Sequence, residues 1–402
     1  MINERVTHMN QERYSRQMLF KHIGNRGQEK IEQQHVLIIG MGALGTHLAE
    51  GLVRAGIGKL TIVDRDYIEY SNLQRQTLYT ENDAREALPK VIAAQRALTH
   101  IRNDIEIHAL IEHVNYQFLE KHGKDVNFIL DATDNFDTRQ LINDFSYKYG
   151  IPWIYGGVVQ STYVEATFIP GQTPCFNCLM PQLPSVNLTC DTVGVIQPEV
   201  TMTTSLQLKD ALKLLTQNEI KTRLTYGDIW EGDHFTIGFS KMYREDCPTC
   251  GHHPYYPHLN QEKQSYATLC GRDTVQYENS NISQEMLIAF LEQHQIHYRT
   301  NNYMTIFKFR GHRIVAFNGG RFLIHEMTHP QNAMQLINQL LFLSCRKARI
   351  DRRQAEQLGI FIQRKIQDYS PGSAISLLTL WERPTSFVWH MYSHHGQTCW
   401  ER

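Results

Sequence analysis

Short apolar runs alternate with segments of helical spacing as far as residue 155. Four apolar runs have the length of buried strands: residues 36–39, 60–63, 126–130 and 152–155. Residues 105–110 alternate between polar and apolar, which also predicts a strand. Between these strands the spacing predicts three helices: 46–55, 89–99 and 136–149. Strands that alternate with helices indicate a doubly wound, mainly parallel α/β sheet, which an amphipathic helix at 10–33 precedes.

The pattern changes beyond residue 157. Residues 162–169 indicate antiparallel strands. Residues 170–198 are rich in proline, cysteine and polar residues, which indicates a long loop. Loops of that length inside a compact domain are usually functional. A helix at 201–216 and a strand at 235–239 follow it.

A smaller unit follows a linker at 254–264. Its pattern predicts one helix and three strands, at 283–294, 303–309, 313–317 and 321–325. Residues 343–402 show no clear periodicity, although 346–353 are basic. We therefore divide the chain into a first domain, a small α/β extension and a tail of unknown structure, at 1–264, 265–342 and 343–402.

Charge and length narrow the class of protein. The 402 residues suffice for more than one domain, and 42% hydrophobic with 20% charged residues is ordinary for a globular protein. A net charge of −1 argues against nucleic acid or a membrane as the main partner. The start at 1–16 is polar, and no apolar run reaches the roughly 18 residues of a membrane span. We expect a cytoplasmic protein whose eight cysteines stay reduced.

A glycine motif follows the first predicted strand. Gly40, Gly42 and Gly45 have the G-x-G-x-x-G spacing and precede a predicted helix. Such glycines allow a tight turn and bring backbone N–H groups close to phosphate at a helix N-terminus. Asp64 ends the second strand, where a carboxylate can accept hydrogen bonds from both ribose hydroxyls. Together the glycine motif and Asp64 predict a nucleotide site. The alternatives are that the glycines form a turn without a ligand and that Asp64 merely ends a strand in a turn.

The residues beyond Asp64 favour a triphosphate. Arg75, with Asn72 and Gln76 beside it, can neutralise and orient phosphate oxygens. Lys90 starts a predicted helix, where its charge opposes the helix dipole, so a merely structural role is less favourable than usual. A solvated surface lysine is the alternative. A dehydrogenase has no need of an arginine and two amides just past the carboxylate that binds its ribose. An enzyme that binds the triphosphate of ATP does need them.

Two carboxylates follow the apolar run 126–130. Asp131 and Asp134 stand where that strand ends. Mg²⁺ prefers one or two carboxylates together with phosphate oxygens and water, so Asp134 is a candidate magnesium ligand. A helix N-cap is the alternative, because a helix is predicted directly after Asp134.

Two cysteine pairs have the spacing of metal ligands. Cys175 and Cys178 form one C-x-x-C pair, and Cys247 and Cys250 form the other. In a reducing compartment two such pairs predict a four-thiolate Zn²⁺ site. The pairs are too far apart in sequence for a zinc ribbon, so the metal would join remote segments. Four protein ligands leave no open position for catalysis, which makes the role structural.

Two further residues carry weaker signals. Cys190 lies in the long loop, where a thiol could attack an acyl-adenylate or be a spectator. Arg16 belongs to the Arg-Tyr-Ser-Arg-Gln sequence at 13–17, and arginines on an amphipathic helix are typical of a solvated face.

Together these motifs resemble those of the bacterial ThiF/MoeB/HesA enzymes, relatives of the ubiquitin-activating enzymes. The resemblance runs from about Arg13 to His253, with every motif above in the family's order. It implies a Rossmann-like fold with a structural zinc site. It also implies an adenylyltransferase that uses Mg-ATP to activate the C-terminal glycine of a ubiquitin-like sulfur carrier protein, in thiamin thiazole or molybdopterin biosynthesis. The extension is similar to one found in members from Gram-positive bacteria.

The resemblance implies a role for each site residue. Asp64 binds the ribose, and the phosphates are held by Asn72, Arg75, Gln76 and Lys90. Asp134 binds Mg²⁺, and the four paired cysteines bind Zn²⁺. Arg16 would reach across a homodimer into the partner's ATP site, which replaces its interpretation as a solvated side chain. Cys190 lies where some members place a reactive cysteine.

The implied partners are a carrier protein that ends in Gly-Gly and a separate sulfur donor protein, because the sequence shows no rhodanese-like domain. Two other functions are weighed against this one. An NAD-dependent oxidoreductase would use the glycine motif and Asp64 but leave Arg75, Lys90 and Asp134 without a role. A non-catalytic scaffold that binds a ubiquitin-like protein would not need these three residues and Arg16 in one chain.

Overall fold

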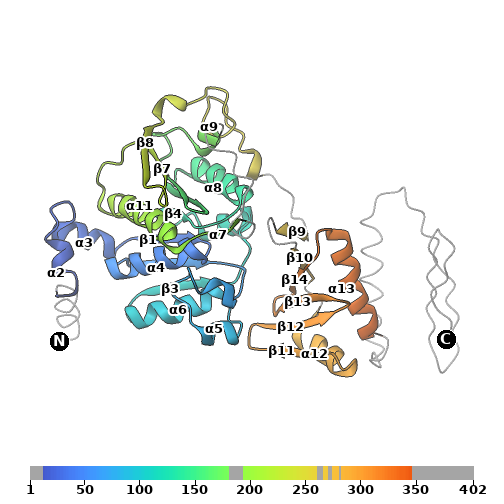
Figure 1. The fold of residues 1–402 in the computed structure, drawn as a ribbon. Coiled ribbons are helices and arrows are strands. Elements are labelled where there is room, and N and C mark those ends of the chain that lie inside the picture. The colour runs from blue at the N-terminus through green and yellow to red at the C-terminus, as the bar shows by residue number, and fades with distance from the viewer. Residues whose placement is uncertain (1–11, 181–192, 260–265, 270–273, 280–281, 346–402) are drawn as a thin grey trace, which may run out of the picture. The chain divides into compact units, whose positions relative to one another are not determined.

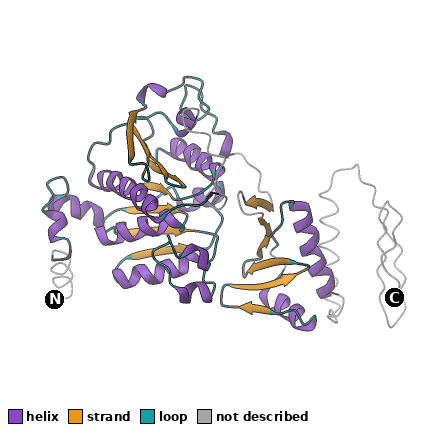
Figure 2. Ribbon diagram, in the orientation of Figure 1, coloured by secondary structure: helices purple, strands orange, loops and turns teal. Residues whose placement is uncertain are grey.

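The computed structural model describes residues 12–180, 193–259, 266–269, 274–279 and 282–345. The chain divides into two compact units, Met1–Leu336 and Ile337–Arg402, of which the second is described only as far as residue 345. The first unit contains two β-sheets, which Figures 1 and 2 show. Among the described residues, no helix is long and apolar enough to cross a membrane.

The larger sheet has eight strands in the order β3-β2-β1-β4-β5-β6-β7-β8. Five are parallel: β1 (His35–Ile39), β2 (Lys59–Val63), β3 (Glu106–Leu110), β4 (Phe128–Asp131) and β5 (Trp153–Val159). Three antiparallel strands extend the sheet beyond β5: β6 (Thr162–Phe168), β7 (Arg223–Asp228) and β8 (Asp233–Gly238). The strand order changes direction between β1 and β4, which is where α/β sheets bind nucleotides. The predicted doubly wound, mainly parallel fold is confirmed.

The side chains of the central strands enter two cores, one on each face of the sheet. On β1, Val36 and Ile38 pack into one core, whereas Leu37 and Ile39 pack into the other. Successive side chains of a strand point to opposite faces, so a strand that is apolar throughout needs cover on both. The first core includes α4 (Ala43–Ala55), α6 (Lys90–Ile101) and α11 (Gln197–Thr216), and the second includes α7 (Tyr116–His122) and α8 (Phe136–Tyr149).

Local sequence signals start and end these helices. Asn135 caps α8, because its side-chain oxygen accepts a hydrogen bond from the backbone N–H of Thr138 at 2.9 Å. Gly150 takes the left-handed conformation directly after α8 and ends it. Five short elements complete this part: α5 (Glu81–Arg85), α9 (Phe176–Leu179), η1 (Tyr70–Asn72), η3 (Ser240–Met242) and η4 (Pro257–Leu259).

Several predicted boundaries were wrong. The helix predicted at 10–33 is interrupted within its described part, where α2 (Ser15–Met18) and α3 (Gly24–Glu32) are separate helices, and Gly24 has a left-handed φ of 58° where α3 begins. The strand predicted at 152–155 continues to Val159. The loop predicted at 170–198 contains α9, and α11 begins at Gln197 because Pro198 fits the first turn of a helix, where its missing N–H has no partner to lose. Residues 181–192 of that loop, with Cys190, lie outside the described residues.

The smaller sheet has six antiparallel strands in the order β11-β12-β13-β14-β10-β9. They are β9 (Tyr266–Leu269), β10 (Thr274–Glu278), β11 (Tyr298–Thr300), β12 (Met304–Phe309), β13 (His312–Phe317) and β14 (Arg321–His325). The helices are α12 (Gln284–Gln293), which packs on β12, and α13 (Pro330–Cys345). The predicted helix and three predicted strands of the extension are confirmed, and its boundaries at 265 and 342 stay predictions.

Candidate active site and metal site

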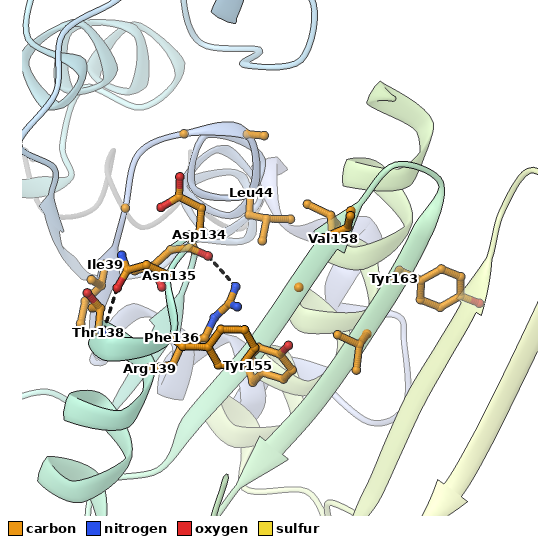
Figure 3. A pocket seen from close by; sticks show the side chains of 18 of the residues that line it. Ile39, Leu44, Asp134, Asn135, Phe136, Thr138, Arg139, Tyr155, Val158 and Tyr163 are labelled. Carbon is orange, nitrogen blue, oxygen red and sulfur yellow. Dashed lines mark hydrogen bonds between the residues drawn. The ribbon is translucent and has the colours of Figure 1, made fainter. Parts of the chain in front are cut away.

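A cavity of about 870 Å³ lies at the carboxyl ends of the parallel strands (Figure 3). Seven predicted site residues line it: Gly40, Gly42, Asp64, Arg75, Gln76, Lys90 and Asp134. They come from the segments that follow β1, β2 and β4, so the sheet brings together residues that are far apart in sequence. Gly45, Asn72 and Arg16 are not among the lining residues.

The glycine turn between β1 and α4 has little room for side chains. Gly40 has a φ of 96°, and a Cβ there would lie 2.5 Å from the carbonyl oxygen of Ala132 at the end of β4. A Cβ on Gly45 would lie 2.0 Å from the carbonyl oxygen of Gly40. Gly45 therefore allows α4 to start against the turn, whereas Gly40 and Gly42 border the cavity.

Asp64 is fixed to this turn at the end of β2. Its Oδ2 accepts a hydrogen bond from the backbone N–H of Met41 at 2.7 Å, and its Oδ1 accepts one from the N–H of Asp66 at 2.7 Å. The hydroxyl of Tyr79 donates to the carbonyl oxygen of Met41 at 2.6 Å. A carboxylate has about four acceptor positions, so Asp64 keeps some for the hydroxyls of a ligand.

The residues predicted to bind phosphate differ in their surroundings. Lys90 is the first residue of α6, is only 3% exposed, and has its Nζ 3.5 Å from Oδ2 of Asp66. A buried ammonium needs such a partner. Gln76 is buried, and its Oε1 accepts no hydrogen bond from the described residues, which leaves an acceptor for a ligand. Asn72 is buried, and its Oδ1 accepts from the N–H of Glu69 at 3.0 Å, so this side chain shapes the turn.

The two carboxylates after β4 have different surroundings. Asp131 is fully buried and forms a 3.0 Å ion pair with Nε of Arg139. Burial raises the pKa of Asp131, and the charge of Arg139 opposes that shift. Asp134 is exposed and borders the cavity (Figure 3), and Asn135 rather than Asp134 caps α8. The capping alternative is therefore wrong, and the Asp134 carboxylate is available to a cation.

Arg139 also lines the cavity, and the sequence analysis missed it. Besides its ion pair, its Nη2 donates to the carbonyl oxygens of Thr133 at 2.6 Å and Gly156 at 3.2 Å. It thereby ties the segment that carries Asp134 to β5. Nothing in the sequence distinguishes it from a surface arginine on the first turn of a helix.

The other end of the cavity comes from the antiparallel strands and is mainly apolar, although Asp228 and Asp233 also line it. Tyr163 of β6, Tyr226 of β7, and Phe235 and Ile237 of β8 line it. Phe235 is 47% exposed and stacks on Tyr226 with 5.2 Å between ring centroids, and Ile237 is 43% exposed. An exposed apolar patch on an edge strand is typical of a site that binds another chain.

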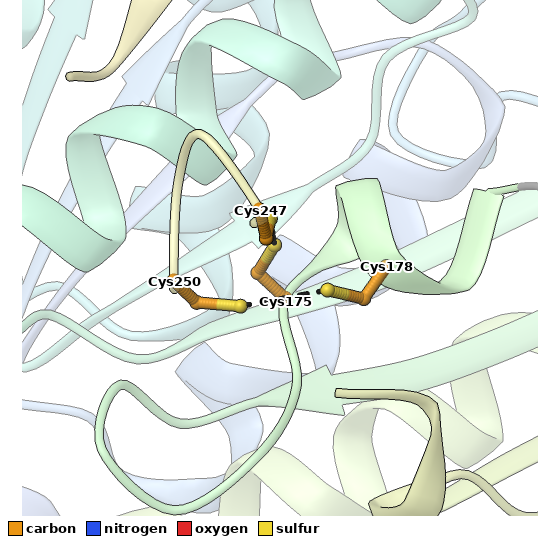
Figure 4. Close-up of side chains that lie close together, drawn as sticks. All are labelled: Cys175, Cys178, Cys247 and Cys250. Carbon is orange, nitrogen blue, oxygen red and sulfur yellow. Dashed lines mark hydrogen bonds between the residues drawn. The ribbon is translucent and has the colours of Figure 1, made fainter. Parts of the chain in front are cut away.

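The four paired cysteines meet in one cluster (Figure 4). Their Sγ atoms all lie within 4.8 Å of one another, with 3.5 Å between Cys175 and Cys247 and between Cys178 and Cys250. Tetrahedral Zn–S bonds of ~2.3 Å place the sulfurs about 3.8 Å apart, so this donor set and spacing fit Zn²⁺.

Helix α8 anchors both cysteine pairs. The N–H of Phe176, between Cys175 and Cys178, donates to Oδ1 of Asn143 at 2.9 Å. The hydroxyl of Thr249 donates to Oδ1 of Asp144 at 2.5 Å and accepts from Nδ2 of Asn177 at 2.8 Å. The same helix begins beside Asp134, so the cysteine cluster and the cavity share one rigid element.

Arg16 lies on α2 and is exposed to solvent. Close to it, Leu19 is 74% exposed and Phe20 is 55% exposed. Among the described residues that line the cavity, Arg16 is absent.

The ThiF family model matches residues 14–249 of this chain. The chain belongs to the ThiF family. It is 42% identical over 317 residues to the sulfur carrier protein ThiS adenylyltransferase of Bacillus subtilis, covering 78% of this chain and 94% of that protein. It is 32% identical over 243 residues to the molybdopterin-synthase adenylyltransferase of Salmonella typhimurium, covering 60% of this chain and 96% of that protein.

A solved structure shares the fold. The crystal structure of Escherichia coli MccB with MccA-N7isoASN superposes with a TM-score of 0.54 over 60% of this chain and 74% of that chain, at 23% identity. The likeness supports the Rossmann-like architecture.

Proposed function

We propose that this chain is an adenylyltransferase that activates the C-terminal glycine of a ubiquitin-like sulfur carrier protein with Mg-ATP. One observation carries the proposal: a single cavity joins the charged groups after the parallel strands to an exposed apolar edge strand. A nucleotide fits the charged end, and the tail of a carrier protein fits a path along the apolar end. The names of the relatives, which act on ThiS or serve molybdopterin synthase, support the same activity.

In the proposed reaction, a carboxylate oxygen of the terminal glycine attacks the α-phosphorus of ATP. A new P–O bond forms, the bond to the bridging oxygen breaks, and pyrophosphate leaves with its electron pair. No general base is needed because the carboxylate is already ionised. Arg75 and Lys90 would neutralise and orient the phosphates, and Mg²⁺ held by Asp134 would supply further positive charge when bound. Gln76 and Asn72 would complete the phosphate site, and Asp64 would bind the ribose.

The proposal includes a homodimer, in which Arg16 of each subunit reaches the other subunit's ATP site. The exposure of Arg16 and of the apolar Leu19 and Phe20 supports this role. It also includes Zn²⁺ bound by the four paired cysteines, a cytoplasmic location that keeps these thiols reduced, and a separate sulfur donor protein. Cys190 remains a candidate reactive cysteine.

An oxidoreductase explains less of the cavity. A nicotinamide nucleotide would account for Gly40 and Asp64 but would leave Arg75, Lys90 and Asp134 without a role.

Intact-mass spectrometry of the carrier tests the proposal. The protein, Mg-ATP and each candidate carrier ending in Gly-Gly are incubated, and the carrier should gain the mass of an adenylyl group, which is AMP less one water. A carrier without its last glycine is the control and should stay unmodified. An unmodified full-length carrier in every case, from an enzyme that binds ATP, would contradict the proposed substrate.

A further inference from the structure

Three of the four predicted phosphate-binding residues belong to one loop with a closed base, and the fourth, Lys90, follows that loop directly. This 67–89 loop runs from Tyr67 to Pro89, and these two residues pair in an isolated antiparallel bridge. The N–H of Lys90 donates to the carbonyl oxygen of Asp66 at 3.0 Å directly beside that bridge. The loop contains three of the predicted residues: Asn72, Arg75 and Gln76. Its geometry therefore depends on what holds its base.

Apolar side chains of the smaller sheet cover the base of the 67–89 loop. Tyr67 and Ala87, from the two ends of the loop, are buried in one cluster with residues of β12, β13 and β14. Those residues are Met304, Val315, Phe317 and Leu323. Both ends of the loop are thus packed against the same sheet of the extension.

Polar contacts fix the downstream end. Nδ2 of Asn301 donates to the carbonyl oxygen of Glu86 at 2.9 Å, and the guanidinium of Arg299 donates to the carbonyl oxygen of Arg85. These bonds satisfy the backbone carbonyl groups of the last residue of α5 and of the residue that follows it.

An arginine fixes the upstream end. Nη1 of Arg313 forms a 2.8 Å ion pair with Oε1 of Glu69, which also accepts a hydrogen bond from the Tyr67 hydroxyl at 3.2 Å. The backbone N–H of Glu69 donates to Asn72, whose carbonyl oxygen accepts from the N–H of Gln76 at 3.1 Å. The ion pair is therefore connected through η1 to residues that border the cavity.

A second arginine of the extension adds buried positive charge. Arg321 is 7% exposed, and its Cζ lies 3.7 Å from the centroid of the Phe317 ring. Its Nη1 and Nη2 have no hydrogen-bond partner among the described residues. Burial lowers the pKa of Arg321 to about 10, and the charge of Asp66 opposes that shift. The extension thus places a cation in the field of Asp66, the carboxylate beside Lys90.

We propose that the extension braces the 67–89 loop, and that Arg313 is a positioning residue that acts through Glu69 to hold the loop in its ATP-binding conformation. The proposal rests on the proposed function only in taking ATP as the ligand. The match to the Bacillus subtilis protein is consistent with it, since 317 aligned residues are more than residues 1–264 can supply.

Charge reversal in the full-length protein tests the brace. The variants are Arg313→Gln, Arg313→Glu, Glu69→Lys and the double variant Arg313→Glu with Glu69→Lys. Lys308→Gln and Lys308→Glu are matched controls, because Lys308 is an exposed cation on the same sheet. ATP binding is measured by calorimetry with Mg²⁺, without any carrier, and KM for ATP and for the carrier are measured separately. Thermal unfolding establishes that each variant is folded.

We expect Arg313→Gln to weaken ATP binding about fivefold and Arg313→Glu to weaken it more, because a partly exposed ion pair couples only modestly to a distant site. KM for ATP should rise in parallel, KM for the carrier should stay unchanged, and the double variant should recover much of the loss. The brace is wrong if Arg313→Gln has the same ATP affinity as the Lys308 variants. It is also wrong if the double variant binds ATP no more tightly than the weaker-binding of Arg313→Glu and Glu69→Lys. If only the brace is wrong, every folded variant should adenylate the carrier as the wild-type protein does. A wild-type protein that binds ATP but modifies no carrier would refute only the proposed substrate.

Discussion

The two ends of the cavity are built in different ways. The charged end consists of segments that follow the parallel strands β1, β2 and β4, where the chain turns sharply and places Asp64, Lys90 and Asp134 at one edge of the sheet. The apolar end consists of side chains on the antiparallel strands, of which Phe235 and Ile237 stand on an exposed edge. Charged groups on tight loops suit one small ligand, whereas an exposed strand suits an extended polypeptide. The contrast predicts that nucleotide binding and carrier binding can be damaged separately.

The largest effect should come from the cysteine cluster, because its loss should destabilise the domain that carries both ends of the cavity. Cys247→Ser should lose Zn²⁺ and destabilise the domain by about 4 kcal/mol or more, since the cluster ties remote segments to α8. Elemental analysis and thermal unfolding measure both. Cys399→Ser, which lacks the pair spacing, should keep the metal. A wild-type protein purified without zinc would contradict the four-thiolate assignment.

Next in size is a change confined to the charged end. Asp134→Asn should lower carrier adenylation by about a hundredfold or more, because it removes a charge that would hold Mg²⁺ without removing bulk. Carrier affinity should not change, since the apolar end is intact. The exposed Asp125 lies before β4, and Asp125→Asn is the matched control. A folded Asp134→Asn protein with near-normal adenylation would refute the metal role.

Mixing two inactive variants tests whether the charged end needs a second subunit. Arg16→Ala and Arg75→Ala should each be inactive. An equal mixture should recover about a quarter of wild-type activity, because half of the dimers are mixed and each has one site with both arginines. Subunit exchange is confirmed by mass spectrometry. No recovery after exchange would mean that Arg16 does not act across the dimer.

A smaller effect should follow from a change confined to the apolar end. Phe235→Ser should raise KM for the carrier about tenfold, the equivalent of one exposed aromatic contact, while ATP affinity stays unchanged. Met286, a partly exposed methionine on α12, gives the control variant Met286→Ser. If Phe235→Ser weakens ATP binding as much as carrier binding, the two ends are not separate.

The smallest effect concerns a buried acid behind the apolar end. Glu199 of α11 is fully buried, and neither of its carboxylate oxygens has a hydrogen-bond partner within the part of the chain that the structure describes. Burial, with the charge of Asp228 acting in the same direction, raises its pKa from 4.5 to about 8. Between these values the folded protein keeps a proton that the unfolded chain releases, so this group lowers stability as pH rises from 4.5 to 8.

Glu199→Gln should therefore stabilise the protein at pH 8.5 by about 1 to 2 kcal/mol and change little at pH 4.5. Unfolding in urea at several pH values measures the difference. Some of the pH dependence should remain, because burial also raises the pKa of Glu165 to about 8. An unchanged slope in the variant would show that Glu199 is ionised in the folded protein.

The sequence analysis predicted correctly those features that neighbouring residues in the sequence determine. The buried parallel strands are short apolar runs, and Gly40 and Asp64 directly follow two of them. The cysteine pairs were recognised by their own C-x-x-C spacing. The break between α2 and α3 depends on a single left-handed glycine, which the helical spacing conceals. Arg139 and the contacts of Arg313 were not predictable, because they join residues whose proximity only the folded sheet creates. Strand β7 was missed because its residues vary between buried and exposed without a regular alternation.

Exchange of labelled pyrophosphate into ATP tests the central claim most directly, because it requires reversible attack on the α-phosphorus. Wild-type protein with Mg-ATP and its carrier should show exchange that depends on the carrier's terminal glycine. Asp134→Asn should show almost none, and Phe235→Ser should approach the wild-type rate at saturating carrier. Exchange that proceeds equally well without any carrier, or is absent with every candidate carrier although ATP binds, would contradict the account.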